Sequence, residues 1–226
     1  IVQDNQSLGY GLLAIERSGL PVLGTIHHPI TVDRKLEMEH AETPYQRFAK
    51  GRWYAFTKMQ SRVAQRLTRI LTVSESSRGD IIKDHGVDPE RLHVVPVGVD
   101  PETFLPVKGV QPVKGQIITT ASADVAMKGL VYLLEAVAKL RTEDPDVHLI
   151  VIGKPKEEGR TARTLADLGL TDAVQFVSGV SEERIVELYS ESELAVVPSL
   201  YEGFSLPAIE AMSCSVCLVA TTGGAI

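Results

Sequence analysis

The chain has 226 residues, and its hydrophobic content of 44% suffices for one large domain or two moderate ones with buried cores. A formal net charge of −6 and a pI near 5.6 argue against nucleic-acid binding by the chain as a whole. Two cysteines do not make a disulfide framework, and no apolar run has the length of a membrane span, so we expect a cytoplasmic location.

The beginning of the chain predicts two strands separated by a polar loop. Residues 1–2 start a strand, residues 3–11 form the loop, and the apolar run from Pro21 to Ile26 forms the second strand, which ends at His27 and His28. The carboxyl end of a parallel strand is a frequent place for functional residues. Adjacent strand residues point to opposite faces, so the two histidines are poorly placed to bind one metal.

A basic segment follows, which we define as Arg47–Arg69. It lies in a helical pattern from Tyr45 to Leu67, and no acidic residue occurs between Thr43 and Ser74. Two interpretations stay open: a solvated helix face, or contact with an anionic acceptor or a membrane surface. The second interpretation uses the cations together with three aromatic residues. These side chains are Arg47, Lys50, Arg52, Lys58, Arg62, Arg66 and Arg69, with Trp53, Tyr54 and Phe56.

The first half of the chain ends in a connector. A strand at residues 70–73 precedes a helix that Ser74 or Ser76 can cap and that Gly86 ends, and residues 92–95 form another strand. The stretch from Val97 to Pro106 then has the proline and glycine density of a connector. We therefore expect one domain over residues 1–98 and a second over residues 99–226.

The second half alternates regularly between strands and helices. Such alternation predicts right-handed βαβ crossovers and a parallel, doubly wound sheet. Strands are expected at residues 117–120, 148–152, 174–177, 194–197 and 217–220, and helices near residues 130–140, 160–166, 182–189 and 207–212.

Two glutamates follow the strand at residues 194–197. Glu202 lies in the loop after that strand, and Glu210 lies in the first turns of a helix that Pro207 is suited to begin. Loops of this kind line the crevice where open α/β sheets bind ligands, and a helix N-terminus there attracts anions such as a diphosphate. The alternative is that both glutamates are solvated surface carboxylates.

The sequence from Glu202 to Met212, Glu-Gly-Phe-Ser-Leu-Pro-Ala-Ile-Glu-Ala-Met, resembles the Glu-x7-Glu signature of family 4 retaining glycosyltransferases. That family has the GT-B fold and uses nucleotide-sugar donors. The resemblance implies an α/β protein with two Rossmann-like, doubly wound parallel-sheet domains. It also implies that the start of the first domain and the end of the second are absent from this internal fragment.

The resemblance also implies roles for individual residues. Glu202 and His27 contact the donor sugar, Glu210 holds the ribose hydroxyls, and Lys128 meets the diphosphate. The arginine that usually precedes this lysine is missing, because Ser122 and Ala123 stand there. The remaining donor contacts are Gly203, Phe204, Ser205 and Leu206 around the sugar and diphosphate, and Val180 beside the base.

The expected function is transfer of a sugar from a nucleotide-diphosphate-sugar donor, with retention of anomeric configuration. The acceptor is a sugar, another small molecule or a lipid-linked compound. We expect no cofactor and no metal, because Lys128 and the Pro207 helix can stabilise the leaving diphosphate. Two alternatives are a sugar-nucleotide-binding domain without turnover and a GT-B epimerase. Cys214 and Cys217 have a redox or metal-ligand spacing, but no second ligand pair accompanies them.

Overall fold

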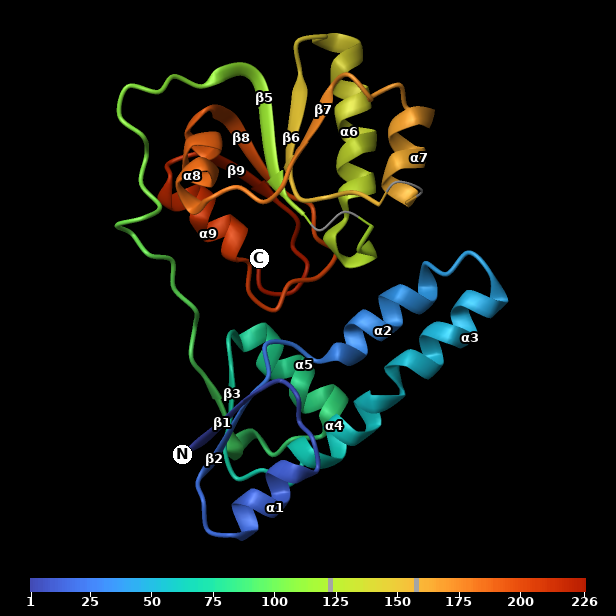
Figure 1. The fold of residues 1–226 in the computed structure, drawn as a ribbon, viewed down its shortest axis with the longest axis vertical. Coiled ribbons are helices and arrows are strands. Elements are labelled where there is room, and N and C mark those ends of the chain that lie inside the picture. The colour runs from blue at the N-terminus through green and yellow to red at the C-terminus, as the bar shows by residue number, and fades with distance from the viewer. Residues whose placement is uncertain (122–123, 157–158) are drawn as a thin grey trace. The chain divides into compact units, whose positions relative to one another are not determined.

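A computed structural model describes residues 1–121, 124–156 and 159–226 of the chain (Figure 1). Contacts divide the chain into two compact units, the first consisting mainly of Ile1–Val97 and the second mainly of Gly98–Tyr201 and Ser205–Gly224. Each unit has its own sheet, and every strand pair in both sheets is parallel. The predicted α/β class with two Rossmann-like units is confirmed.

The first unit contains a four-stranded sheet with its strands in chain order. Helices connect these parallel strands, and their apolar faces bury a core that includes Val63, Leu67 and Ile81. The strands are β1 (Val2–Asn5), β2 (Val22–Thr25), β3 (Ile70–Thr72) and β4 (Leu92–Val94), and the helices are α1 (Gly11–Arg17), α2 (Ile30–Glu39), α3 (Pro44–Trp53), α4 (Thr57–Ala64) and α5 (Glu75–His85).

The helical pattern from Tyr45 to Leu67 does not form one helix. Helix α3 ends at Trp53, the short 3-10 helix Tyr54–Phe56 follows, and α4 begins at Thr57. Helix α2 was not predicted, because it is polar and has no buried residue, so it lacks the apolar stripe that marks a helix in sequence. The strand β1 also extends into the polar residues that were predicted as a loop.

The predicted residues at both ends of α5 are confirmed. Ser74 is the N-cap, and its side chain accepts a hydrogen bond from the backbone N–H of Ser77. Gly86 ends the helix in the left-handed conformation with φ 65°, which glycine adopts without steric cost. The helix begins at Glu75, directly after this cap.

The second unit contains a five-stranded sheet in the order β7-β6-β5-β8-β9. Residues 95–112 contain neither helix nor strand and lead into its central strand. The strands are β5 (Val113–Thr120), β6 (His148–Ile152), β7 (Val174–Val177), β8 (Ser192–Val197) and β9 (Cys217–Ala220), and the helices are α6 (Leu130–Glu143), α7 (Arg160–Asp167), α8 (Glu182–Ser190) and α9 (Leu206–Ser213).

Helices cover both faces of this sheet, as Figure 1 shows. Ile117 packs with α6 and α7 on one face, and the next residue, Ile118, packs with α8 and α9 on the other. This alternation follows from the two-residue period of a strand, and it gives the unit two cores. In the described parts of the chain, no helix is long and apolar enough to cross a membrane.

Candidate functional site

The strand order of the second unit creates a switch point beside β5. From β5 the chain moves outward to β6 and β7, and it then returns to the other side of β5 to form β8 and β9. The loops after β5 and β8 therefore leave the sheet in opposite directions, and an open α/β sheet binds ligands in the crevice between such loops. The first loop carries Lys128, and the second carries the sequence from Glu202 to Leu206.

A close backbone approach joins these two loops. The N–H of Leu200 donates to the carbonyl oxygen of Met127 at 2.8 Å. Gly129, which ends the 3-10 helix Ala126–Lys128, has φ 64°, and a Cβ there would lie 2.0 Å from the carbonyl oxygen of Pro198. Only glycine fits this position, so the sequence Lys128-Gly129 holds the lysine at the switch point through a backbone contact.

The loop after β8 ends at the N-terminus of α9. Ser205 is the N-cap, and Pro207 lies in the first turn, so the predicted helix start is confirmed within one residue. The Ser205 Oγ is buried and has no hydrogen-bond partner among the described residues. A buried hydroxyl without a partner is costly, and it is therefore a group that a ligand can satisfy.

Glu210 lies one turn further along α9 and is half-buried. Burial, with repulsion from Glu182, raises the pKa of its carboxyl group, while a hydrogen bond from the Tyr189 hydroxyl lowers it. The Tyr189 hydroxyl also lies 3.2 Å from Thr120 Oγ1, so it joins the end of β5 to α9. The carboxylate of Glu210 is thus held in place by a buried side chain and is not a freely solvated charge.

Asp124 lies in the loop after β5, four residues before Lys128. Its carboxylate accepts hydrogen bonds from the backbone N–H groups of Lys156 and Thr161, each at 2.9 Å. Burial raises the pKa of Asp124, but these hydrogen bonds outweigh burial and leave the pKa below its ordinary value. Asp124 therefore joins the loop after β5 to the start of α7. Its partners lie more than 30 positions away, so no local pattern could reveal them.

Glu202, Gly203 and Phe204 follow β8 in the chain, but their contacts group them with the first unit, whereas Ser205 and Leu206 belong to the second. The carbonyl oxygen of Glu202 accepts from the N–H of Ala225 at 2.9 Å, and Gly203 and Phe204 follow in the same loop. Val180 follows the edge strand β7 and precedes α8. The structure thus brings Lys128 together with the loop before α9, whereas Val180 lies two strands away from β5.

His27 belongs to the first unit. Its Nε2 lies 2.7 Å from Asn5 Oδ1, and its backbone N–H donates to Gln6 Oε1 at 2.9 Å. His28 makes a separate contact, with Nε2 2.8 Å from Asp33 Oδ2. The two rings therefore have different partners. Ser122 and Ala123, where the companion arginine is missing, lie outside the described residues.

The two cysteines are not bonded to each other, and Cys214 is buried whereas Cys217 is exposed. Burial, with a contribution from Glu210, raises the pKa of the Cys214 thiol to about 11. The thiol therefore stays protonated near neutral pH, and a protonated thiol is a poor nucleophile and metal ligand. These properties disfavour a redox role for this pair.

Two parallel α/β units connected by an irregular segment define the GT-B class of proteins. Residues 102–226 match the family described as glycosyl transferases group 1, and residues 1–103 match the one described as Glycosyltransferase Family 4. The chain therefore belongs to the group 1 glycosyl transferases.

Curated relatives and solved structures agree with this assignment. The chain is 47% identical to an MMP α-(1→4)-mannosyltransferase of Mycolicibacterium hassiacum, over the whole chain and 54% of that protein. It is 30% identical to a D-inositol 3-phosphate glycosyltransferase of a Mycobacterium species, over 96% of the chain and 49% of that protein. The chain thus spans about half the length of the curated relatives it matches.

Among solved structures, a sucrose-phosphate synthase from Thermosynechococcus elongatus has a TM-score of 0.75 at 21% identity and covers 98% of the chain and 56% of that structure. Anabaena HepE in complex with UDP has a TM-score of 0.71 at 20% identity, covering 99% of the chain and 60% of that structure. At these identities the similarity establishes the fold alone.

Proposed function

We propose that this protein transfers a sugar from a nucleotide-diphosphate-sugar donor to an acceptor, with retention of anomeric configuration. The observation that carries the proposal is the contact at the switch point of the second unit. There the loop with Lys128 is hydrogen-bonded to the loop that leads into α9, through Leu200 and Met127. A cation and a helix N-terminus thus belong to two connected loops, an arrangement suited to a diphosphate.

In this proposal the leaving diphosphate is stabilised without a metal. Negative charge grows on the leaving group as the sugar–phosphate bond breaks, and groups that are already in position to meet that charge lower the barrier. Lys128 supplies a compact positive charge, and the N–H groups at the start of α9 supply the positive end of a helix dipole. The Ser205 hydroxyl, which is buried without a partner among the described residues, donates to a phosphate or sugar oxygen.

The other predicted site residues position the donor. The Glu210 carboxylate accepts hydrogen bonds from the two ribose hydroxyls, which is a charge-assisted arrangement. Glu202 and His27 contact the sugar, backbone groups from Gly203 to Leu206 face the sugar and the diphosphate, and Val180 lies against the base. These roles come from the resemblance to family 4.

The names of the relatives suggest which donor to test first. The Mycolicibacterium hassiacum relative is named a mannosyltransferase, so nucleotide-activated mannose is the first choice, followed by uridine diphosphate glucose. The acceptor is a sugar or another hydroxyl compound. Contact between the Arg47–Arg69 segment and an anionic membrane stays a prediction.

Product analysis tests the proposal. The chain is incubated with a nucleotide-activated sugar and a panel of glycoside acceptors, and the products are examined by proton NMR. A new glycoside with the donor's anomeric configuration supports the proposal. An inverted product, a free epimer of the sugar nucleotide, or binding without any product would each contradict it. The last two outcomes correspond to the epimerase and to the binding domain without turnover.

A further inference from the structure

Helix α3 presents an exposed aromatic face that the proposed donor site does not use. The side chains of Tyr45, Phe48 and Trp53 are 79%, 65% and 75% exposed. Together with Ala49 and Arg52 they line a pocket of about 500 Å³, which is within the size range of small-ligand sites. Large apolar groups in contact with water at adjacent positions indicate a surface that binds something. We call these five residues the aromatic face.

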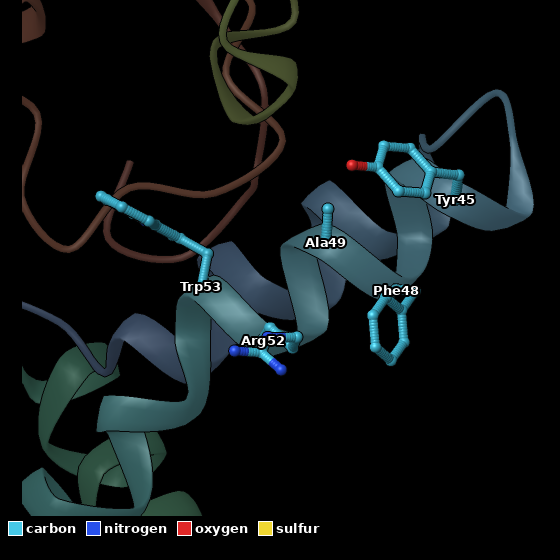
Figure 2. A pocket seen from close by; sticks show the side chains of 5 residues that line it. All are labelled: Tyr45, Phe48, Ala49, Arg52 and Trp53. Carbon is cyan, nitrogen blue, oxygen red and sulfur yellow. The ribbon is translucent and has the colours of Figure 1, made fainter.

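The spacing of these residues gives the face its shape. Tyr45, Ala49 and Trp53 are four residues apart, so they follow one line along the helix, and Figure 2 shows Ala49 between the two aromatic side chains. Eight residues of helix separate the two rings by about 12 Å along the axis. Because Ala49 has only a methyl group, it leaves space between the two aromatic rings. We call Ala49 the floor of this space and the rings of Tyr45 and Trp53 its walls. Phe48 and Arg52 lie along the neighbouring line of the helix (Figure 2).

We propose that the aromatic face binds a neutral oligosaccharide, with successive sugar rings lying along α3 between Tyr45 and Trp53. A pyranose ring has apolar C–H faces and a polar hydroxyl rim, so it packs flat against an aromatic ring while its hydroxyls reach polar groups. Arg52 supplies several N–H donors for these hydroxyls. The inference deepens the proposed function, since it gives the acceptor or product of a sugar transfer a docking surface.

Charge favours a neutral partner over an anionic membrane. Residues 30–53, which comprise α2 and α3, contain five Lys and Arg and four Asp and Glu, which gives a formal charge of +1. The four carboxylates of this stretch thus offset all but one of its five cations, and Lys50 Nζ lies 2.6 Å from Glu37 Oε2. Membrane attraction contributes about 1 kcal/mol for each basic residue near the surface. With a formal charge of +1, α2 and α3 together gain little from this attraction.

The composition and size of the face also favour a sugar. The five lining residues include no Leu, Ile or Val, whereas an inserting helix carries aliphatic side chains beside its aromatic ones. A stable protein interface needs about 800 Å² on each partner, which is far more than five residues of one helix supply. A flat chain of sugar rings needs only the aromatic surface that is present.

Trp53 is the only tryptophan of the chain, so its fluorescence reports on this face directly. The 226-residue chain is titrated with α-(1→4)-linked mannotetraose and, separately, with maltotetraose, and tryptophan emission and quenching by acrylamide are recorded. We expect saturable protection of Trp53 from acrylamide by at least one of the tetraoses. No protection at millimolar tetraose would overturn the inference.

Variants test whether the tetraose binds at the aromatic face or at another surface. Ala49→Leu fills the floor between the rings, and Tyr45→Ala removes one wall, so each should weaken tetraose binding at least fivefold. Tyr132→Ala, an exposed tyrosine on α6, and Arg47→Gln, which does not line the pocket, are the matched controls and should bind normally. Normal tetraose binding by both Ala49→Leu and Tyr45→Ala would place the site elsewhere and contradict the proposal.

Two other occupants give distinct results. If phosphatidylglycerol vesicles shift Trp53 emission, and more strongly in the more apolar Ala49→Leu variant, the face binds membrane and the inference fails. If Trp53 protection depends on protein concentration without any sugar, a second copy covers the face and the inference also fails. Calorimetry with nucleotide sugars runs in parallel: donor binding without tetraose binding refutes only this inference, and tetraose binding without donor binding refutes only the proposed function.

Discussion

Glu210 has two neighbours that change its pKa in opposite directions. Burial and the charge of Glu182 raise the pKa, and the hydrogen bond from Tyr189 lowers it, with a net increase. The folded state therefore binds a proton at Glu210 more readily than the unfolded state does. It follows that Glu210 contributes less to folding stability as the pH rises from the ordinary glutamate pKa through the raised value. Residues that bind a ligand often reduce the stability of the fold, and the buried carboxylate of Glu210 is expected to do so.

Substitution of Glu210 should separate stability from binding. Glu210→Gln removes a charge that the fold disfavours, so the urea midpoint at neutral pH should rise. The same variant, like Glu210→Ala, should lose about 1.5–3 kcal/mol of donor binding, because the ribose hydroxyls lose a charged acceptor. Urea unfolding and calorimetry measure the two effects. Unchanged donor affinity in both variants would refute the ribose assignment.

The pH dependence of donor binding should follow the neighbours of Glu210. Binding requires the carboxylate, so affinity should fall with decreasing pH at a midpoint above the ordinary glutamate pKa. Tyr189→Phe removes the hydrogen bond and should move the midpoint to higher pH, whereas Glu182→Gln removes repulsion and should move it to lower pH. Glu183→Gln is the control, because the groups that shift the Glu210 pKa are Glu182 and Tyr189. Shifts of the same sign in the first two variants would contradict this account.

At the scale of elements, the contact between the loops after β5 and β8 depends on Gly129. Gly129→Ala introduces both a left-handed alanine and a Cβ 2.0 Å from the Pro198 carbonyl oxygen. Gly169 is a matched control, because its φ is 65° and a Cβ there meets no atom within 4 Å. Gly169→Ala should cost about 1–2 kcal/mol of stability, and Gly129→Ala should cost clearly more and also weaken donor binding. Equal costs in urea unfolding would show that the loop contact does not need glycine.

The contact between α4 and α5 predicts a pH-dependent stability. His85 is 2% exposed, and its Nδ1 lies 2.8 Å from Ser61 Oγ. Burial lowers the pKa of His85, although Asp84 acts in the opposite direction. The unfolded chain thus binds a proton at His85 more readily, so this contribution to stability is complete above the ordinary histidine pKa and is lost as the pH falls below it.

Urea unfolding at a series of pH values from neutral to mildly acidic tests this prediction. His85→Gln should reduce the loss of stability on acidification, because no buried group then has to take up a proton. His93→Gln, at an exposed position on β4, should leave the loss unchanged. An identical acid dependence in wild type and His85→Gln would show that His85 does not control it.

At the scale of the whole molecule, the sequence predicted the features that depend on local chemistry. Pro207 and Gly86 marked helix ends, because the backbone conformations that these residues favour act within a few residues. The alternation of apolar strand and helix patterns indicated a doubly wound sheet. The 3-10 helix within the basic segment and the polar helix α2 were not predictable, since α2 buries no residue.

The site was predictable only in part, for a related reason. The spacing of Glu202 and Glu210 lies within one strand–loop–helix unit and is readable from the sequence. The Tyr189 hydrogen bond to Glu210, the role of Asp124 and the contact between Met127 and Leu200 all depend on chain topology. Distant segments meet at the carboxyl edge of the sheet only after the strand order is known.

The location of the nucleotide is the most direct test of the proposed site. Backbone amide shifts of the ¹⁵N-labelled chain are compared before and after addition of uridine, guanosine or adenosine diphosphate. We predict that at least one nucleotide shifts the amides of Lys128, Gly129, Ser205 and Leu206, where the loops of the switch point meet, and that Lys128→Ala reduces the response. Saturable shifts confined to the first unit, or no shift with any of the three, would contradict the account.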